Sequence, residues 1–326
     1  MQIFDNANFN FIRWRWHAMA LSTTVVVAGL ALMLTRGMPL GIDFTGGTAV
    51  IVQFAEDVPV ERVREAVASI PGDEVVLRYD DPAKRQVLIR LPLVDGMETG
   101  TGLEAQARQV LGALTAAGLP SFTEIQRDAV GPSVGGDLQR KGIYAVVTSL
   151  LAITVYIGFR FRFSFAVGAI AATLHDVLVT LAFLVFFRYD LSLNVVAAIL
   201  TITGYSVNDT IVIFDRVREN LRARRRDPLD QVVNHSVNQT LGRTIITAGT
   251  TLLSVLALFI FGGEALEGFA FTMIVGILSG TYSTVFIASS IAILLSGKKD
   301  AAAGAAAASD STPPTASKKA KRAKAS

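Results

Sequence analysis

The chain has 326 residues, of which 51% are apolar and 17% are charged, and its formal net charge is +3. A soluble globular chain carries more charge than this, so the composition excludes an ordinary soluble protein. The sequence has no cysteine, which excludes disulfides and thiolate metal sites and leaves three histidines as the only nitrogen ligands.

Six apolar stretches are long enough to cross a membrane, which takes about 20 residues in a helix. The first follows Arg13 and Arg15 but is too long for the apolar core of a signal peptide, and it lacks a clear cleavage site. We therefore predict a retained helix there. The six stretches lie at about 17–36, 141–159, 165–187, 191–214, 244–262 and 269–295. The predicted fold class is a polytopic α-helical membrane protein with six transmembrane helices.

Lysine and arginine in the short segments between these stretches fall on one side of the membrane. They lie at Arg13 and Arg15, Arg160 and Arg162, Arg216 to Arg226, and Lys298 and Lys299. The excess of positive charge marks that side as cytoplasmic, so both termini are predicted to be cytoplasmic. The predicted organisation is residues 1–37 for the N-terminus and first helix, 38–138 for an exported domain, 139–297 for helices two to six, and 298–326 for a tail.

The segment 38–138 is long enough to fold by itself. Its pattern predicts a strand at 48–54, a helix at 59–70, a hairpin from 74–79 and 86–93, a helix near 101–118 and a strand at 122–130. This βαββαβ order is typical of the ferredoxin-like fold. One sheet face would be covered by two helices, and the other would be free to contact a partner or a passing polypeptide. The alternative is a simple spacer.

The tail from about 298 is rich in alanine, then in Ser, Thr and Pro, and ends in a basic run. It is predicted to be disordered and to keep positive charge on the cytoplasmic side. Its basic end could contact anionic lipid or ribosomal RNA, but no specific nucleic-acid partner is predicted.

Four ionisable residues lie at membrane depth, where each costs about 2.5–3.5 kcal/mol on insertion scales. They are His175 and Asp176 near the middle of the third stretch, Asp209 roughly 9 Å inside the end of the fourth, and Arg243 at the predicted start of the fifth. Asp209 and Arg243 can pair, and protonation of Asp209 would release the arginine. The alternatives are a static pair or an arginine that extends to the surface. His175 could equally be a hydrogen-bonded interior histidine.

Small residues in the sixth stretch predict close helix packing. Gly276 and Gly280 form a Gly-x-x-x-Gly pattern, with Ser279 and Ser283 beside it. Polar residues at 203–208 precede Asp209 and could build a wet cavity around it.

Three segments carry a resemblance to a known family: GIDFTGGT at 41–48, GYSVNDTIVIFDRVREN at 204–220 and LGRTIITAGTT at 241–251. In these segments the chain resembles the SecF family of the bacterial Sec export machinery, part of the RND superfamily. The resemblance implies that the membrane carboxylate of the family falls on Asp209 and its arginine on Arg243. Asp176 is a further proton-coupling candidate because of its depth in the third stretch, not because of the resemblance.

The resemblance also implies a role in protein export. It implies SecD as the direct partner, the SecYEG channel and SecA as associated machinery, YajC and YidC as further partners, and a translocating preprotein as the substrate, all driven by the proton-motive force in the bacterial cytoplasmic membrane. Two alternatives stay open: an RND-type exporter of lipids or small molecules, and a structural scaffold of the translocon. No nucleophile and base pair, phosphate loop or metal spacing occurs, so neither an enzyme nor a cofactor is predicted.

Overall fold

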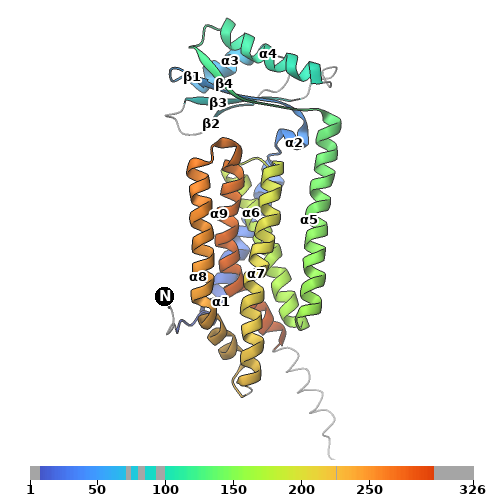
Figure 1. Ribbon diagram of the computed structural model, residues 1–326, viewed down its shortest axis with the longest axis vertical. Helices are drawn as coiled ribbons and strands as arrows, with labels where there is room; N and C mark the ends of the chain where they lie inside the picture. Colours follow the sequence, from blue (N-terminus) through green and yellow to red (C-terminus); the bar gives the residue numbers. More distant parts are fainter. Residues whose placement is uncertain (1–7, 71–74, 80–84, 93–99, 225, 297–326) are drawn as a thin grey trace, which may run out of the picture.

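The structure, a computed structural model, consists of a helical bundle with a small sheet lying across one end (Figure 1). It describes residues 8–70, 75–79, 85–92, 100–224 and 226–296. The tail predicted for 298–326 lies outside the described residues. We refer to the bundle end beneath the sheet as the sheet end and to the opposite one as the far end.

Within the described residues, six helices are long and apolar enough to cross a membrane, which confirms the number predicted from the sequence. The last continues beyond its α-helical part through a π-helical segment, η3 at Thr284–Ala288. The bundle helices are α1 (Arg15–Arg36), α5 (Pro132–Arg160), α6 (Phe163–Phe187), α7 (Leu193–Ala223), α8 (Leu229–Phe261) and α9 (Glu264–Ser283).

Local signals explain where the central helices stop and start. Arg188 adopts a left-handed conformation with φ of 60° and ends α6. Ser192 caps α7, because its hydroxyl accepts a hydrogen bond of 3.3 Å from the backbone N–H of Val195. The turn between these two helices is therefore short and well defined, and it lies at the sheet end (Figure 1).

Helix α8 starts much earlier than the apolar stretch predicted, so the expectation that Arg243 begins the fifth helix is wrong. The helix begins at Leu229, directly after Pro228, and Arg243 lies inside it. The polar side chains of the first turns lower the hydropathy of this segment below that of a membrane span. They do not prevent helix formation, because valines on one side of the segment are buried against the bundle: Val232, Val233 and Val237.

The sheet unit, β1 to β4 with α3 and α4, has the predicted ferredoxin-like arrangement. Its strand order is β2-β3-β1-β4, and all neighbours are antiparallel. In chain order the elements are β1 (Gly47–Phe54), α3 (Val60–Val67), β2 (Val75–Tyr79), β3 (Gln86–Leu91), α4 (Gly100–Ala116) and β4 (Phe122–Val130). They fall inside the range 38–138, whose limits as a domain stay a prediction.

The two faces of the sheet have different surroundings. One face packs against α3 and α4, and Val50, Val52 and Ile89 are fully buried there. The other face is turned toward the bundle (Figure 1). A smaller apolar cluster on this second face includes Ile51 and Leu88. The face predicted to be open is thus directed at the sheet end of the bundle.

Short backbone connections join the sheet unit to the bundle. The short helix α2 (Ile42–Thr45) lies just before β1. The N–H of Gly41 donates to the carbonyl of Leu191 at 2.8 Å, and the N–H of Leu191 donates to Pro39 at 2.7 Å. The chain leaving α1 is therefore hydrogen-bonded to the turn between α6 and α7.

Candidate functional site

Asp176 lies in the middle of α6 and is almost completely buried, with 2% of its surface exposed. Three serine hydroxyls donate to its carboxylate. Ser206 of α7 and Ser283 of α9 donate to Oδ2 at 2.6 and 2.7 Å, and Ser279 of α9 donates to Oδ1 at 2.7 Å. We call Asp176 and these three serines the Asp176 cluster. It links three helices through one carboxylate.

Two glycines on α9 allow α7 to come close enough for this cluster. A Cβ at Gly280 would lie 3.0 Å from Cβ of Ser206, and a Cβ at Gly276 would lie 2.4 Å from Cδ1 of Ile202. Ser279 and Ser283 are one helical turn apart and face the same direction. The sequence predicts close packing at Gly276 and Gly280. In the structure, the helix that lies against these two glycines is α7 of the same chain.

His175 extends the cluster toward α1. Its Nδ1 is 3.1 Å from Oδ1 of Asp176, and its ring stacks on Tyr282 with 6.4 Å between the ring centroids. The hydroxyl of Tyr282 donates to the carbonyl of Ala18 at 2.6 Å. Nε2 of His175 is buried and has no hydrogen-bond partner among the described residues.

Asp209 lies on α7, about one turn beyond Ser206. Its Oδ1 accepts a hydrogen bond of 2.8 Å from the hydroxyl of Thr244 on α8. Its Oδ2 is buried and has no partner within the part of the chain that the structure describes. Asp209 therefore differs from Asp176, because only one donor holds its carboxylate.

Arg243 is next to Thr244 and is exposed on the surface of the bundle. The ion pairs formed by the described residues include none between Arg243 and Asp209. The sequence predicts Asp209 and Arg243 on consecutive helices. In the structure these helices, α7 and α8, are in contact at Asp209 through Thr244. The side chain that contacts Asp209 is Thr244, which the sequence analysis did not single out.

The π-helical segment η3 lies beside this site. Thr284, its first residue, shares a hydrogen bond of 2.9 Å between hydroxyls with Thr210, the residue after Asp209. The hydroxyl of Ser289 reaches back to the carbonyl of Thr284 at 3.1 Å. Single-turn π segments inside helices are frequent at functional sites, because they rotate the residues that follow.

Charged residues at the far end mark the rim of the bundle. Arg160, the last residue of α5, pairs with Asp215 of α7 at 2.9 Å. Helix α7 continues beyond Asp215 to Ala223. Asp209 nevertheless lies deeper in the bundle than this ion pair.

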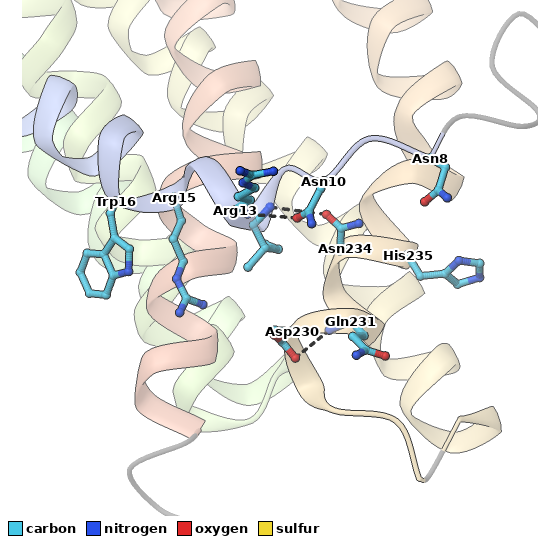
Figure 2. A pocket seen from close by; sticks show the side chains of 10 residues that line it. Asn8, Asn10, Arg13, Arg15, Trp16, Asp230, Gln231, Asn234 and His235 are labelled. Atoms are coloured by element: carbon cyan, nitrogen blue, oxygen red, sulfur yellow. Dashed lines mark hydrogen bonds between the residues drawn. The ribbon is translucent and has the colours of Figure 1, made fainter.

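A polar pocket of about 550 Å³ lies at the far end, between the N-terminal segment and the start of α8 (Figure 2). The amide of Asn234 accepts from the N–H of Phe11 at 2.9 Å and donates to the carbonyl of Phe9 at 3.0 Å. Asn238 accepts from the N–H of Phe9 at 2.8 Å. These asparagines attach the N-terminal segment to α8, and the pocket is separate from the two carboxylates.

Polar contacts also join the sheet unit to the sheet end. Arg90 of β3 forms an ion pair with Asp190, and the two side chains are 22% and 23% exposed. Burial lowers the pKa of Arg90, but a guanidinium stays protonated in proteins. The hydroxyl of Tyr189 donates to Glu267 at 2.5 Å, and burial together with this hydrogen bond raises the pKa of Tyr189. The hydroxyl therefore remains a donor.

These contacts border a cleft of about 390 Å³ between the open sheet face and the bundle. Asp43 of α2, at its edge, accepts from the N–H of Leu193 at 2.8 Å. No group of three or more Asp, Glu, His or Cys side chains that could hold a metal ion occurs in the described ranges.

Comparison with known proteins identifies the family. The family model described as protein export membrane protein SecD/SecF, C-terminal, matches residues 110–298, and the SecD/SecF GG motif matches residues 31–58. The chain belongs to the SecD/SecF family of protein export membrane proteins. The resemblance noted in its sequence motifs is confirmed.

Relatives of this SecF-family chain match along nearly its whole length. Protein translocase subunit SecF of Desulfurispirillum indicum is 41% identical over 284 residues, which cover 86% of this chain and 89% of the relative. Protein translocase subunit SecF of Escherichia coli O157:H7 is 37% identical over 293 residues, covering 90% of this chain and 89% of the relative.

Solved structures show the same fold. The crystal structure of SecDF from Thermus thermophilus, a translocon-associated membrane protein, aligns with 91% of this chain at 33% identity and a TM-score of 0.80. SecDF in its super-membrane-facing form aligns with 92% of the chain at a TM-score of 0.68. This SecF-family chain spans 40% of the length of either SecDF chain. It is a multi-pass membrane protein with a small α+β unit.

Proposed function

We propose that this chain is an auxiliary subunit of the Sec protein translocase, which promotes preprotein export across the bacterial cytoplasmic membrane together with a SecD-type partner. The relatives named SecF support this role, since they match about nine-tenths of the chain. The chain corresponds to 40% of SecDF, so the rest of such a unit has to come from a partner. SecYEG, SecA, YajC and YidC belong to the same proposal as associated machinery.

The surface of α7 and α8 supports a partner in the membrane. Asn208, Arg243, Thr247 and Thr250 are exposed on this chain, and all four lie within helices that can span a membrane. Polar groups in contact with lipid tails are costly, so they normally face other helices. A SecD-type bundle would cover them and complete the surroundings of Asp209.

The coupling to the proton-motive force is proposed to reside in Asp209. The observation that carries this proposal is its carboxylate at membrane depth, with one donor on Oδ1 and a buried, unpartnered Oδ2. A proton can bind to that oxygen without displacing an existing hydrogen bond. A carboxylate with every oxygen filled could not change its protonation state without rearranging its donors.

Arg243 is proposed as the switching partner of Asp209. A cation next to an ionised carboxylate stabilises it, and protonation removes this attraction. In the structure Arg243 directly precedes Thr244, which donates to Asp209, but the described residues form no ion pair between Arg243 and that carboxylate. Asp176 belongs to the same proposal as a second proton-coupling residue, since Ser206 connects it to the helix of Asp209. Its protonation would require its serine donors to rearrange, because both of its oxygens already accept hydrogen bonds.

The experiment is export measured per assembled complex, with and without a proton gradient. Asp209→Asn keeps the size of the side chain but cannot bind and release a proton, so gradient-dependent export should fall to background while assembly continues. Arg243→Lys should lower it partly or fully, because lysine lacks the planar donor fork. Asp215→Asn, at the far-end rim, is the matched control. Full gradient response in assembled Asp209→Asn would refute Asp209 as the coupling residue.

The same proposal puts both termini and the far end in the cytoplasm and the sheet unit outside. Ala117 lies exposed just after α4, and Ala223 is the exposed last residue of α7. Because the chain has no cysteine, single substitutions to cysteine can be labelled without background. An impermeant thiol reagent should label Ala117→Cys in intact cells and not Ala223→Cys. The reverse pattern would invert the orientation.

A further inference from the structure

The three helices that meet at the Asp176 cluster are linked to the sheet unit at their sheet ends: α6 by Asp190, which follows it, α7 through α2, and α9 through Tyr189. Helix α6 carries Asp176 in its middle, and Arg188, which ends it, is followed by Tyr189 and Asp190. Helix α9 carries Ser279 and Ser283, and Glu267 lies in its first turns. The same helices therefore carry both the buried cluster and, nearer the sheet end, the contacts that lead to the sheet unit.

Helix α7 also carries a residue of the Asp176 cluster and a contact at the sheet end. It contributes Ser206 to the cluster and Asp209 to the proposed proton site. At its other end, the N–H of Leu193 donates to Asp43, which lies in the short helix before β1. A shift of α6 would act on the sheet unit through Asp190, a shift of α7 through α2, and a shift of α9 through Tyr189.

The most direct of these contacts reaches the centre of the sheet. Arg90 lies on β3, an interior strand that pairs with β1 and β2 on its two sides. Its ion pair with Asp190 is three-quarters shielded from solvent on both sides. Shielded ion pairs are less screened by salt than surface pairs. Displacement of Asp190 would thus act on the whole sheet rather than on a loose edge.

The second contact ties the two helix ends to each other. The hydroxyl of Tyr189 donates to Glu267 at 2.5 Å, and the ring of Tyr189 stacks on Phe271 of α9 with 4.3 Å between the centroids. The residue that precedes Asp190 is therefore fixed to α9. The start of α9 is thus linked to the residues that follow α6 at this point.

We propose that Arg90, Asp190, Tyr189 and Glu267 form a coupling joint that transmits movements of α6, α7 and α9 to the sheet unit, and that export driven through this chain depends on it. The four residues act as positioning residues, since none of them binds the proton. The inference rests on the proposed function, because it assumes that a proton event in the bundle does work on the exported side.

The test uses exchange of the charges at the joint in the full complex. Asp190→Arg and Arg90→Asp each place like charges together, so each single change should lower gradient-dependent export at least fivefold per assembled complex. The double change restores opposite charges and should recover at least half of the activity. A purely structural contact would instead lower the amount of assembled complex and leave its gradient response unchanged.

A second ion pair in the sheet unit supplies the matched control. Arg127 and Glu124 pair within β4 at 2.6 Å and make no ion pair with the bundle. Glu124→Arg, which breaks this pair by placing two positive charges together, should leave export within twofold of the parent protein. Full gradient-dependent export by the Asp190→Arg variant would refute the proposal that export depends on this joint. If Asp209→Asn is inactive in the same assay while Asp190→Arg is active, the proposed proton coupling stands and only the joint fails. An active Asp209→Asn instead refutes Asp209 as the coupling residue.

Cross-linking distinguishes a joint that stays closed from a contact that opens. With no native cysteine, Arg90→Cys combined with Asp190→Cys can be joined by a short bismaleimide. Because the two cysteines remove the ion pair, the uncross-linked complex should export less than the parent protein. The cross-link closes the joint again and should raise gradient-dependent export to at least half of the parent's. Loss of activity on cross-linking, or failure of the two cysteines to react with each other, would contradict the proposal.

Discussion

Replacement of Asp176 by alanine tests whether the buried cluster holds three helices together. The change removes the common acceptor of Ser206, Ser279 and Ser283, which lie on α7 and α9 at 2.6 to 2.7 Å from the carboxylate. Hydrogen bonds between membrane helices contribute about 0.6 kcal/mol each on average and at most about 1.7 kcal/mol. Three of them correspond to about 2 to 5 kcal/mol of unfolding free energy.

The lower half of that range is the better expectation for Asp176→Ala. A serine hydroxyl inside a helix can turn to a carbonyl of its own preceding turn, and Ser283 already lies 3.2 Å from the carbonyl of Gly280. We therefore expect a loss of about 2 to 3 kcal/mol. Asp176→Asn keeps one acceptor oxygen and should lose less.

Unfolding of the purified protein in mixed micelles by titration with SDS, followed by circular dichroism, measures this loss. Asp137→Ala is the control, because Asp137 pairs with Lys141 on the exposed surface of α5, and such a pair contributes only about 0.2–0.5 kcal/mol. If Asp176→Ala unfolds at the same SDS fraction as Asp137→Ala, the cluster does not stabilise the bundle and the reasoning fails.

Three further changes test other parts of the structure. Thr244→Val removes the hydroxyl that donates to Asp209 and should lower gradient-dependent export, which the same change at the exposed Thr35 of α1 should not do. In Gly168→Ala, the new Cβ would lie 2.5 Å from a backbone carbonyl oxygen of the π-helical segment, so the SDS titration should show a loss of about 1–3 kcal/mol. Gly158→Ala meets nothing within 4 Å and should show no such loss. Asn238→Ala removes a clamp on the N-terminal segment and should speed tryptic cleavage there.

The elements of this fold are predictable because each has a strong local signal. Apolar length indicates the six membrane helices, and alternation with turn residues indicates the four strands. The start of α8 was missed because the segment from Leu229 is polar on one side and its valines are buried only in the assembled bundle. Hydropathy averages over both sides of a helix and cannot separate them.

The site was only partly predictable. Asp176 and Asp209 are visible in the sequence because charged residues are rare at membrane depth. The sequence does not show which carboxylate Ser206 contacts, since it lies one turn from Asp209 and yet donates to Asp176. That choice depends on the rotation of α7 against α6 and α9, which packing determines. The spacing of Ser279 and Ser283, one turn apart, is the signal that could have indicated a common acceptor.

The attachment of the N-terminal segment to α8 has a consequence for how the chain is made. Phe9 and its partner Asn238 are separated by 229 residues. At about 5–20 residues per second, the ribosome needs roughly 11 to 46 seconds to synthesise that interval. During this time the N-terminal segment has been synthesised, while Asn238 of α8, to which it is hydrogen-bonded in the finished protein, has not. A nascent chain stopped before α8 is complete should therefore expose an N-terminal segment that the finished protein protects.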